Sequence, residues 1–131
     1  MNDLPRSERL RGKVTVSALM SKGRWGSTQA LKYCHLRRGS TDGEAVPNRI
    51  MVSVPKRLFK RAVKRNLLKR RLREAYRTSK DLLPPEGNDI LFLYNSSELL
   101  GYGPVREQVR TILARIGNER QQQHTEMAAD R

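Results

Sequence analysis

The sequence has very little of what several protein classes depend on. One cysteine, Cys34, occurs in 131 residues, which excludes an internal disulfide framework and a cysteine-based zinc site. No apolar run approaches the roughly 20 residues that a membrane-spanning helix needs, and the first ten residues lack the hydrophobic stretch of a signal peptide. We therefore expect a cytoplasmic protein.

Groups suited to catalysis are also scarce. Hydrolytic enzymes commonly use clustered carboxylates that hold metal ions, or histidines that transfer protons. The two histidines are His35, in a predicted strand, and His124, in a predicted disordered tail, and no acidic residues cluster at helical or strand spacing. The sequence thus predicts no catalytic residues of its own.

Positive charge, by contrast, is abundant and concentrated in one segment. The chain carries 27 lysines and arginines against 13 acids, which gives a net charge of +14. Between residues 56 and 77 there are eleven cations and one acid, Glu74, so this segment holds +10 and the other 109 residues only +4. A local excess of this size indicates a binding surface for a polyanion.

Hydrophobic patterning predicts one domain over residues 10–117, between a flexible N-terminus (1–9) and a disordered tail (118–131). The predicted elements are a short helix that ends at Gly23, strands over 29–36, 49–55 and 90–94, and an amphipathic helix over 105–116, with loops at 37–49 and 82–89. The strand at 90–94 is nearly all apolar, which is typical of a strand covered on both faces. The strand at 29–36 alternates, with one face made of Leu31, Tyr33 and His35 and the other of Lys32, Cys34 and Leu36.

The second half of the basic segment separates into two faces when it is plotted as an α-helix at 100° per residue. The apolar stripe consists of Leu68, Leu72, Ala75 and Tyr76. The opposite line consists of Asn66, Arg70, Arg73 and Arg77, flanked by Lys69. Upstream the separation fails, because Arg61 and Lys64 would lie on the apolar side. We therefore expect the regular helix to begin near Arg65.

Two faces in register argue against a disordered polycationic arm, which needs no apolar stripe. A solvated helix face is a further alternative, but such faces usually mix charges, because like charges four residues apart repel by about 0.2–0.5 kcal/mol per pair. A membrane surface is disfavoured because the apolar side is needed for the core, and a helix-turn-helix reader because strands flank the helix. The residues favour a nucleic-acid surface and leave open whether the partner is DNA or RNA.

Residues 52–77, VSVPKRLFKRAVKRNLLKRRLREAYR, resemble the signature of the bacterial ribonuclease P protein component. That signature places Arg-Asn-Arg, Lys-Arg and Arg-Glu on one helix, and the matching positions here are Arg65-Asn66-Leu67, Lys69-Arg70 and Arg73-Glu74. The resemblance covers about residues 8–117. It implies an α/β (α+β) sandwich with a small central β-sheet and three helices, in which the basic helix forms a left-handed βαβ crossover.

The resemblance also implies a function. The chain would be the protein subunit of the ribonuclease P ribonucleoprotein, an endoribonuclease that removes the 5′ leader of precursor tRNA. In this family the catalytic RNA performs the hydrolysis, with Mg²⁺ bound mainly by the RNA and no cofactor bound tightly by the protein. The implied partners are the catalytic RNA and precursor tRNA, with no membrane or DNA. A ribosome-associated structural RNA-binding protein is the alternative, on size and basicity alone.

Site residues follow from the resemblance position by position. The expected RNA contacts are Arg65, Asn66, Lys69, Arg70 and Arg73, to which the helix line adds Arg77; Asn66 would also lie near a metal ion shared with the RNA. The expected leader contacts are Lys56, Arg57, Val16, Met20 and Tyr33, or Cys34 if the strand register shifts by one. Leu67 replaces the second arginine of the motif, and Val16 and Met20 stand where phenylalanine is common, so we expect one lost contact and less base stacking.

Overall fold

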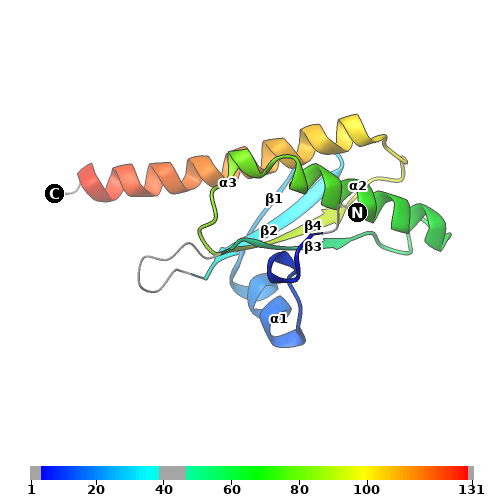
Figure 1. The fold of residues 1–131 in the computed structure, drawn as a ribbon, viewed down its shortest axis with the longest axis horizontal. Coiled ribbons are helices and arrows are strands. Elements are labelled where there is room, and N and C mark those ends of the chain that lie inside the picture. Colours follow the sequence, from blue (N-terminus) through cyan, green and yellow to red (C-terminus); the bar gives the residue numbers. More distant parts are fainter. Residues whose placement is uncertain (1–3, 39–46, 130–131) are drawn as a thin grey trace.

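The computed structural model describes residues 4–38 and 47–129, and side chains as far as residue 119. Most of the predicted loop at 37–49 lies outside the described residues. The helices are α1 (Lys13–Lys22), α2 (Ala62–Arg77) and α3 (Tyr102–Ala129), with short 3₁₀ turns η1 (Arg6–Glu8) and η2 (Lys80–Leu82). The strands are β1 (Arg24–Ser27), β2 (Leu31–Arg37), β3 (Arg49–Ser53) and β4 (Asn88–Tyr94) (Figure 1).

The four strands form one mixed sheet in the order β1-β2-β4-β3. β2 pairs antiparallel with both β1 and β4, whereas β3 and β4 are parallel neighbours. Parallel neighbours need a crossover connection, and α2 supplies it. The predicted α+β sandwich with a small central sheet and three helices is confirmed, and β4 is buried in the middle of the sheet as its apolar sequence predicts.

The helices cover the sheet unequally. α2 and α3 lie on one face and α1 on the other (Figure 1). The larger core lies under α2 and α3, and its helical part includes Leu68, Leu72, Ala75, Tyr76, Val109, Ile112 and Leu113. The smaller core, under α1, consists of Leu10, Leu19, Cys34 and Leu91. Both faces of the sheet are therefore used, but only one is fully covered by helices.

Strand β1 is absent from the predicted elements. Its sequence, RWGS, has no apolar alternation, and three of its four residues are exposed. It forms because β2 offers it a backbone edge, with Gly26 opposite Tyr33. A β-carbon on Gly26 would lie 2.4 Å from the Tyr33 ring, so only glycine lets this ring cross β1.

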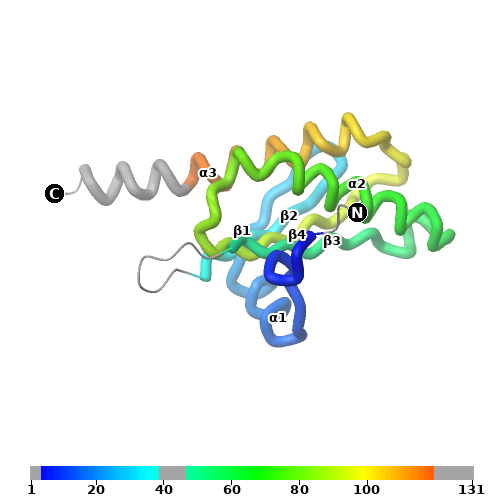
Figure 2. The backbone as a smooth tube through the Cα atoms, in the orientation of Figure 1, coloured from blue at the N-terminus to red at the C-terminus, as the bar shows by residue number. Residues whose placement is uncertain are grey.

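The N-terminal segment also differs from its prediction. Residues 1–9 are predicted to be flexible, and of these residues 4–9 are packed against the domain (Figure 2). Leu4 is buried in the larger core, and the Leu10 N–H donates to the Ile50 carbonyl at 2.9 Å. Lys80 lies 2.7 Å from the Glu8 carboxylate. Packing against β3 therefore orders a stretch whose local sequence carries no periodic signal.

Two helix boundaries are corrected as well. α2 begins at Ala62 rather than near Arg65, and its first turn reaches beyond the core, so Val63 is 78% exposed and the cations there stay solvated. The predicted tail from residue 118 is helical to Ala129. The apolar stripe ends at Ile116, but residues 118–129 lack glycine and proline and contain good helix formers, so the helix continues from its packed part.

The buried stripe of α2 yields a direct test of the fold. Leu72 is fully buried, so Leu72→Ala should lower the free energy of unfolding by about 2–5 kcal/mol, through lost burial and the cavity left behind. Urea denaturation measures the change. Val63→Ala, on the same helix but exposed, is the control and should change stability by no more than about 0.5 kcal/mol. Equal effects of the two substitutions would mean that the helix is rotated differently.

Candidate nucleic-acid interface

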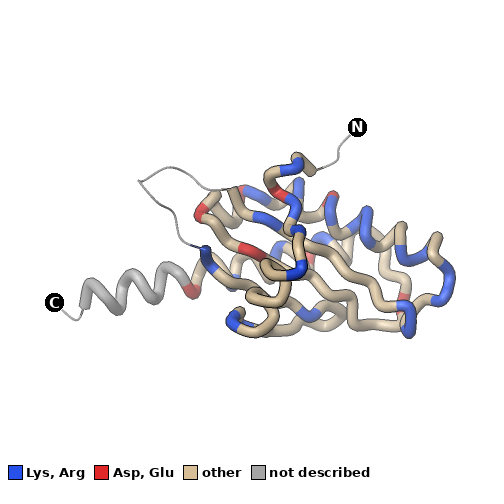
Figure 3. Tube along the Cα trace, turned by 90° about the horizontal axis from the view of Figure 1, so that it is seen from below, with Lys and Arg blue, Asp and Glu red and all other residues tan. Residues whose placement is uncertain are grey.

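The outer face of α2 carries the predicted line of polar and cationic residues. Asn66, Arg70 and Arg73 are exposed, while the stripe on the opposite side is buried. The rotation of the helix is therefore as predicted. Lysines and arginines recur along the whole of α2 and the turn before it (Figure 3). Over the part of the chain that the structure describes, the side chains of these three residues make no hydrogen bond or ion pair within the protein, which leaves them free for a ligand.

Other cations of the same segment have partners in the protein. Arg65 donates to the carbonyls of Phe59 and Lys60, at 2.8 and 2.9 Å, and so fastens the turn that leads into α2. Arg71 donates to the Leu100 carbonyl at the approach to α3. Arg65 is thus held by the turn before α2, next to Asn66 at the start of the line. Arg71 instead links α2 to the loop before α3. Leu67, the departure from the motif, is half-buried, as expected for a residue that packs.

Arg77 ends the line in an ion pair. Its Nε donates to the Glu74 carboxylate at 3.0 Å, and a second bond joins the same two groups. These hydrogen bonds lower the pKa of the Glu74 carboxyl below its usual value. A phosphate that approached Arg77 would compete with Glu74, so the unpaired part of the line runs from Asn66 to Arg73.

The predicted leader contacts fall into two places. Lys56 and Arg57 are exposed and follow β3 by a few residues. Val16 is half-buried against the smaller core, and Met20 is 48% exposed at the end of α1. Their roles stay predictions. All four nevertheless have positions in which a ligand could reach at least part of the side chain.

Tyr33 is not brought together with Val16 and Met20. It is 7% exposed and belongs to the larger core under α2 and α3, on the opposite face of the sheet from α1. The neighbouring Cys34 does face α1 but is completely buried, and its thiol donates to the Leu19 carbonyl at 3.2 Å. Burial raises the pKa of the Cys34 thiol. Neither residue offers a surface on the α1 side.

An aromatic ring on that side comes instead from Trp25, a residue that the sequence patterns missed. Trp25 pairs with Cys34 across β1 and β2, which puts its side chain on the α1 face, and it is 46% exposed. Its indole Nε1 donates to the Met20 carbonyl at 3.2 Å, and the Lys32 ammonium lies 5.9 Å from the ring centre. Trp25 is the only tryptophan in the sequence, and this could have marked it as a candidate for base stacking. Its strand, β1, has no alternating pattern from which the direction of the side chain could be predicted.

Clusters of metal-ligating side chains do not occur in the described part of the chain. Among its side chains, no group of three or more His, Cys, Asp or Glu could hold a metal ion. The largely buried His35 lies 3.2 Å from the Glu119 carboxylate; burial lowers its pKa, and Glu119 opposes the shift. No helix among the described residues has both the length and the apolar character to cross a membrane.

Comparison with known proteins identifies the family. A family model described as Ribonuclease P matches residues 4–117, which include the whole of the predicted domain. The chain belongs to the ribonuclease P protein family. This is a family of tRNA-processing ribonucleoprotein subunits, so the resemblance noted in the sequence is confirmed.

Two curated relatives, both called ribonuclease P protein component, show the extent of the likeness. The chain is 42% identical to the Chlorobaculum tepidum protein over 83 residues, which are 63% of this chain and 54% of that protein. It is 35% identical to a Porphyromonas gingivalis protein over 123 residues, which are 86% of this chain and 85% of that protein.

Solved structures of RNase P proteins share the fold. The Thermotoga maritima protein has 24% sequence identity and a TM-score of 0.68, over 82% of this chain and 96% of that chain. The Staphylococcus aureus protein has 18% identity and a TM-score of 0.67, over 82% and 94%. At these low sequence identities, the likeness to the two solved structures shows that the fold is shared and shows nothing further.

Proposed function

We propose that this chain is the protein subunit of a ribonuclease P holoenzyme in the cytoplasm, where it binds the catalytic RNA and the 5′ leader of precursor tRNA to promote 5′ maturation. The observation that carries the proposal is the unpaired line of Asn66, Arg70 and Arg73 on the outer face of α2. Membership of the ribonuclease P protein family supports the ribonuclease P RNA as the partner of this line.

The line is suited to the phosphate backbone of a folded RNA. A guanidinium group is planar and presents a fork of N–H donors that matches two phosphate oxygens. Because the opposite stripe of α2 is buried, Arg70 and Arg73 are presented in a fixed direction and at helical spacing. Neutralising RNA phosphates releases counterions, so affinity should fall steeply as salt rises.

The chemistry in this proposal belongs to the RNA. Mg²⁺ prefers oxygen ligands and keeps several waters, and the exposed amide of Asn66 supplies one suitable oxygen. A single neutral oxygen cannot hold the ion, so RNA phosphates would provide the remaining ligands. We propose that Asn66 positions a hydrated ion at the boundary between the protein and the RNA, and that the bound ion supplies the charge that activates hydrolysis.

The α1 face of the sheet is proposed to hold the leader. The strand register aligns one residue from each of the four strands in a row across this face: Ser27, Lys32, Leu93 and Ser53. This row runs from the neighbourhood of Trp25 on β1 to the end of β3, which Lys56 and Arg57 follow. A single strand along the row would meet Val16, Met20 and Trp25 on one side and the two cations on the other. In this arrangement Trp25 replaces Tyr33 as the stacking residue.

Reconstitution tests the proposed function as a whole. With a cognate catalytic RNA, the protein should lower the magnesium concentration needed to cleave precursor tRNA, because its cations offset repulsion between the two RNAs. Cleavage rates across a magnesium titration, with and without the protein, measure this effect. No difference at limiting magnesium would contradict the proposal, and recovery of ribosomal subunits rather than one discrete RNA in a pull-down would support the ribosome-associated alternative.

Two adjacent arginines separate RNA binding from folding. Arg70→Gln should weaken binding to the catalytic RNA roughly tenfold, as expected for the loss of a charge-assisted hydrogen bond, and should leave the melting temperature unchanged. Arg71→Gln removes the same charge one residue away but also the bond to the Leu100 carbonyl, so it should lower the melting temperature and largely spare RNA affinity. Filter binding and thermal denaturation read out the two effects, and a reversed pattern would place the RNA on another face of α2.

The leader surface has its own test. Trp25→Leu should weaken binding of precursor tRNA by about 1–3 kcal/mol, the usual contribution of one stacked base, and leave binding of leaderless tRNA unchanged. Val14→Ala, an exposed apolar residue of α1 at 84% exposure, is the control. The fluorescence of the single tryptophan should also change when a leader oligonucleotide is added. An equal loss with and without the leader would exclude Trp25 from this surface.

A further inference from the structure

One side of α3 carries polar side chains that reach the edge strand β1. Gln108, Arg115 and Glu119 are spaced by seven and four residues, so all three lie on one line along the helix. The line borders the apolar stripe through which α3 packs on the sheet, and α3 crosses the face of the sheet opposite α1 (Figure 1). We call these three residues the α3 polar seam.

Gln108 holds the turn that joins β1 to β2. Its Oε1 accepts hydrogen bonds from the Thr28 hydroxyl at 2.7 Å and from the Ala30 N–H at 2.8 Å. A backbone N–H can only donate, so the oxygen of the Gln108 amide, and not its nitrogen, must face the turn. Ala30 is 3% exposed, so without Gln108 its N–H would lose this partner in a place that water hardly reaches. The turn is therefore fastened to one particular side chain of α3.

Arg115 and Glu119 hold the strand β1 itself. Arg115 donates to the Ser27 carbonyl at 2.8 Å. The Glu119 carboxylate lies 3.6 Å from the Arg24 guanidinium and 3.2 Å from the imidazole of His35 on β2. Arg24 and Ser27 are the first and last residues of β1, so both ends of the strand are joined to α3.

Strand β1 depends on these bonds because it has no share in the core. It is an edge strand of the sheet and pairs with β2 on one side only. None of its four residues is buried. A segment with few buried apolar contacts opens locally at low cost in free energy. The bonds from α3 to the turn and to both ends of the strand disfavour that opening.

The position of Trp25 follows from the position of β1. Trp25 lies between Arg24 and Ser27, the two residues that α3 holds. Successive side chains of a strand point to opposite faces, so the indole projects to the α1 face, away from the seam. Its Nε1 donates to the Met20 carbonyl at 3.2 Å. The ring is therefore oriented from the α1 side, while the backbone that carries it is held from the α3 side.

We propose that the α3 polar seam is a positioning element for the leader surface: it holds β1 closed, so that Trp25 is in place before the 5′ leader binds. The inference rests on the proposed function and deepens it, since it names residues on the opposite face of the sheet that set leader affinity without touching the leader. If only the closed form of β1 binds the leader, the apparent dissociation constant rises as the closed fraction falls. Gln108 and Arg115 are then positioning residues.

Substitutions in the seam test the proposal in the reconstituted holoenzyme. Gln108→Leu should weaken binding of precursor tRNA about three- to tenfold, because hydrogen bonds are lost from the closed form of β1, and should leave binding of leaderless tRNA unchanged. Gln108→Glu keeps the oxygen that accepts both bonds and should restore most of the leader affinity. Arg115→Gln, at an exposed residue, should act like Gln108→Leu. Its matched control is Arg110→Gln, which removes the same charge from α3 at a residue that contacts Asp81 instead of β1.

A double-mutant cycle separates positioning from a general loss of stability. In the Trp25→Leu background, Gln108→Leu should have no further effect on binding of precursor tRNA, because no ring is left to position. Acrylamide quenching of the single tryptophan in the free protein should increase in Gln108→Leu and return toward the wild-type value in Gln108→Glu. This second measurement needs no RNA and reports on β1 directly.

The outcomes separate this inference from the proposed function. If quenching increases in Gln108→Leu but precursor tRNA binds as tightly as to wild type, α3 holds β1 without affecting the leader, and the inference is overturned. Equal losses with and without Trp25, or equal losses with leaderless tRNA, would also overturn it, because the substitution would then act through the whole domain. If the wild-type holoenzyme binds precursor and leaderless tRNA equally, the proposed leader surface fails and the inference falls with it, whatever the quenching shows.

Discussion

The packing of one apolar stripe of α2 against the sheet is the constraint on which the rest of the molecule depends. Leu68, Leu72 and Ala75 have no exposed surface, and a helix packed this closely cannot rotate without opening cavities in the core. The rotation decides which residues point outward, so burial on one side determines the order of cations on the other. Because α2 also connects the parallel strands β3 and β4, the same packing places the helix beside the β3 edge of the sheet.

The cations of the basic segment divide by the bonds they make. Arg65 binds backbone carbonyls of the turn before α2, Arg71 binds the Leu100 carbonyl in the loop before α3, and Arg77 is paired with Glu74. The guanidinium groups of Arg70 and Arg73 have no ion-pair partner among the described residues. Unpaired like charges cost stability, and a domain with a buried stripe of this size can carry that cost. The distinction between structural and available arginines is invisible in composition, where all five contribute equally to the net charge.

Alternation along the strands gives the sheet two different faces. On one face Tyr33 and its neighbours fill the core beneath α2 and α3, and on the other Lys32 and Trp25 remain accessible beside α1. The short helix α1 covers only part of its face, and a row of small, apolar and cationic side chains stays open across the strands. A scaffold of this kind can present one RNA surface on a helix and another on a sheet, with a shared core between them.

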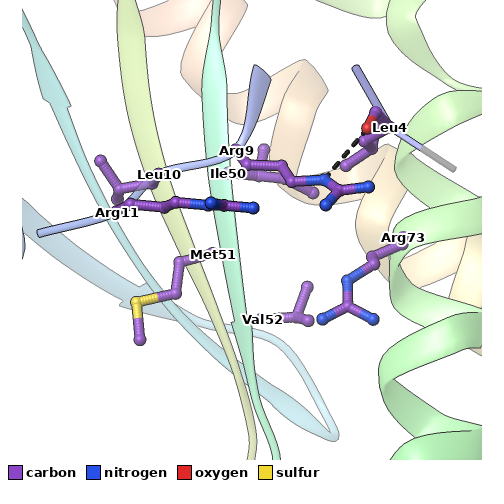
Figure 4. A pocket seen from close by; sticks show the side chains of 8 residues that line it. All are labelled: Leu4, Arg9, Leu10, Arg11, Ile50, Met51, Val52 and Arg73. Carbon is purple, nitrogen blue, oxygen red and sulfur yellow. Dashed lines mark hydrogen bonds between the residues drawn. The ribbon is translucent and has the colours of Figure 1, made fainter. Parts of the chain in front are cut away.

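The sequence by itself determined the elements with strong local periodicity: β2, β3, β4, the amphipathic part of α3 and the face of α2 that carries the cations. Those signals need no information from distant residues. Tertiary structure alone decided the rest. Alternation showed which residues of β2 share a face but not which helix covers it, so Tyr33 was misplaced and Trp25 was missed on a strand that exists only through its pairing with β2. Leu4 is a lone apolar residue in a polar stretch, and its burial depends on partners far along the chain. Arg9 and Arg11 line one groove together with Arg73 (Figure 4) for the same reason, because spacing along the chain does not predict proximity across a sheet edge.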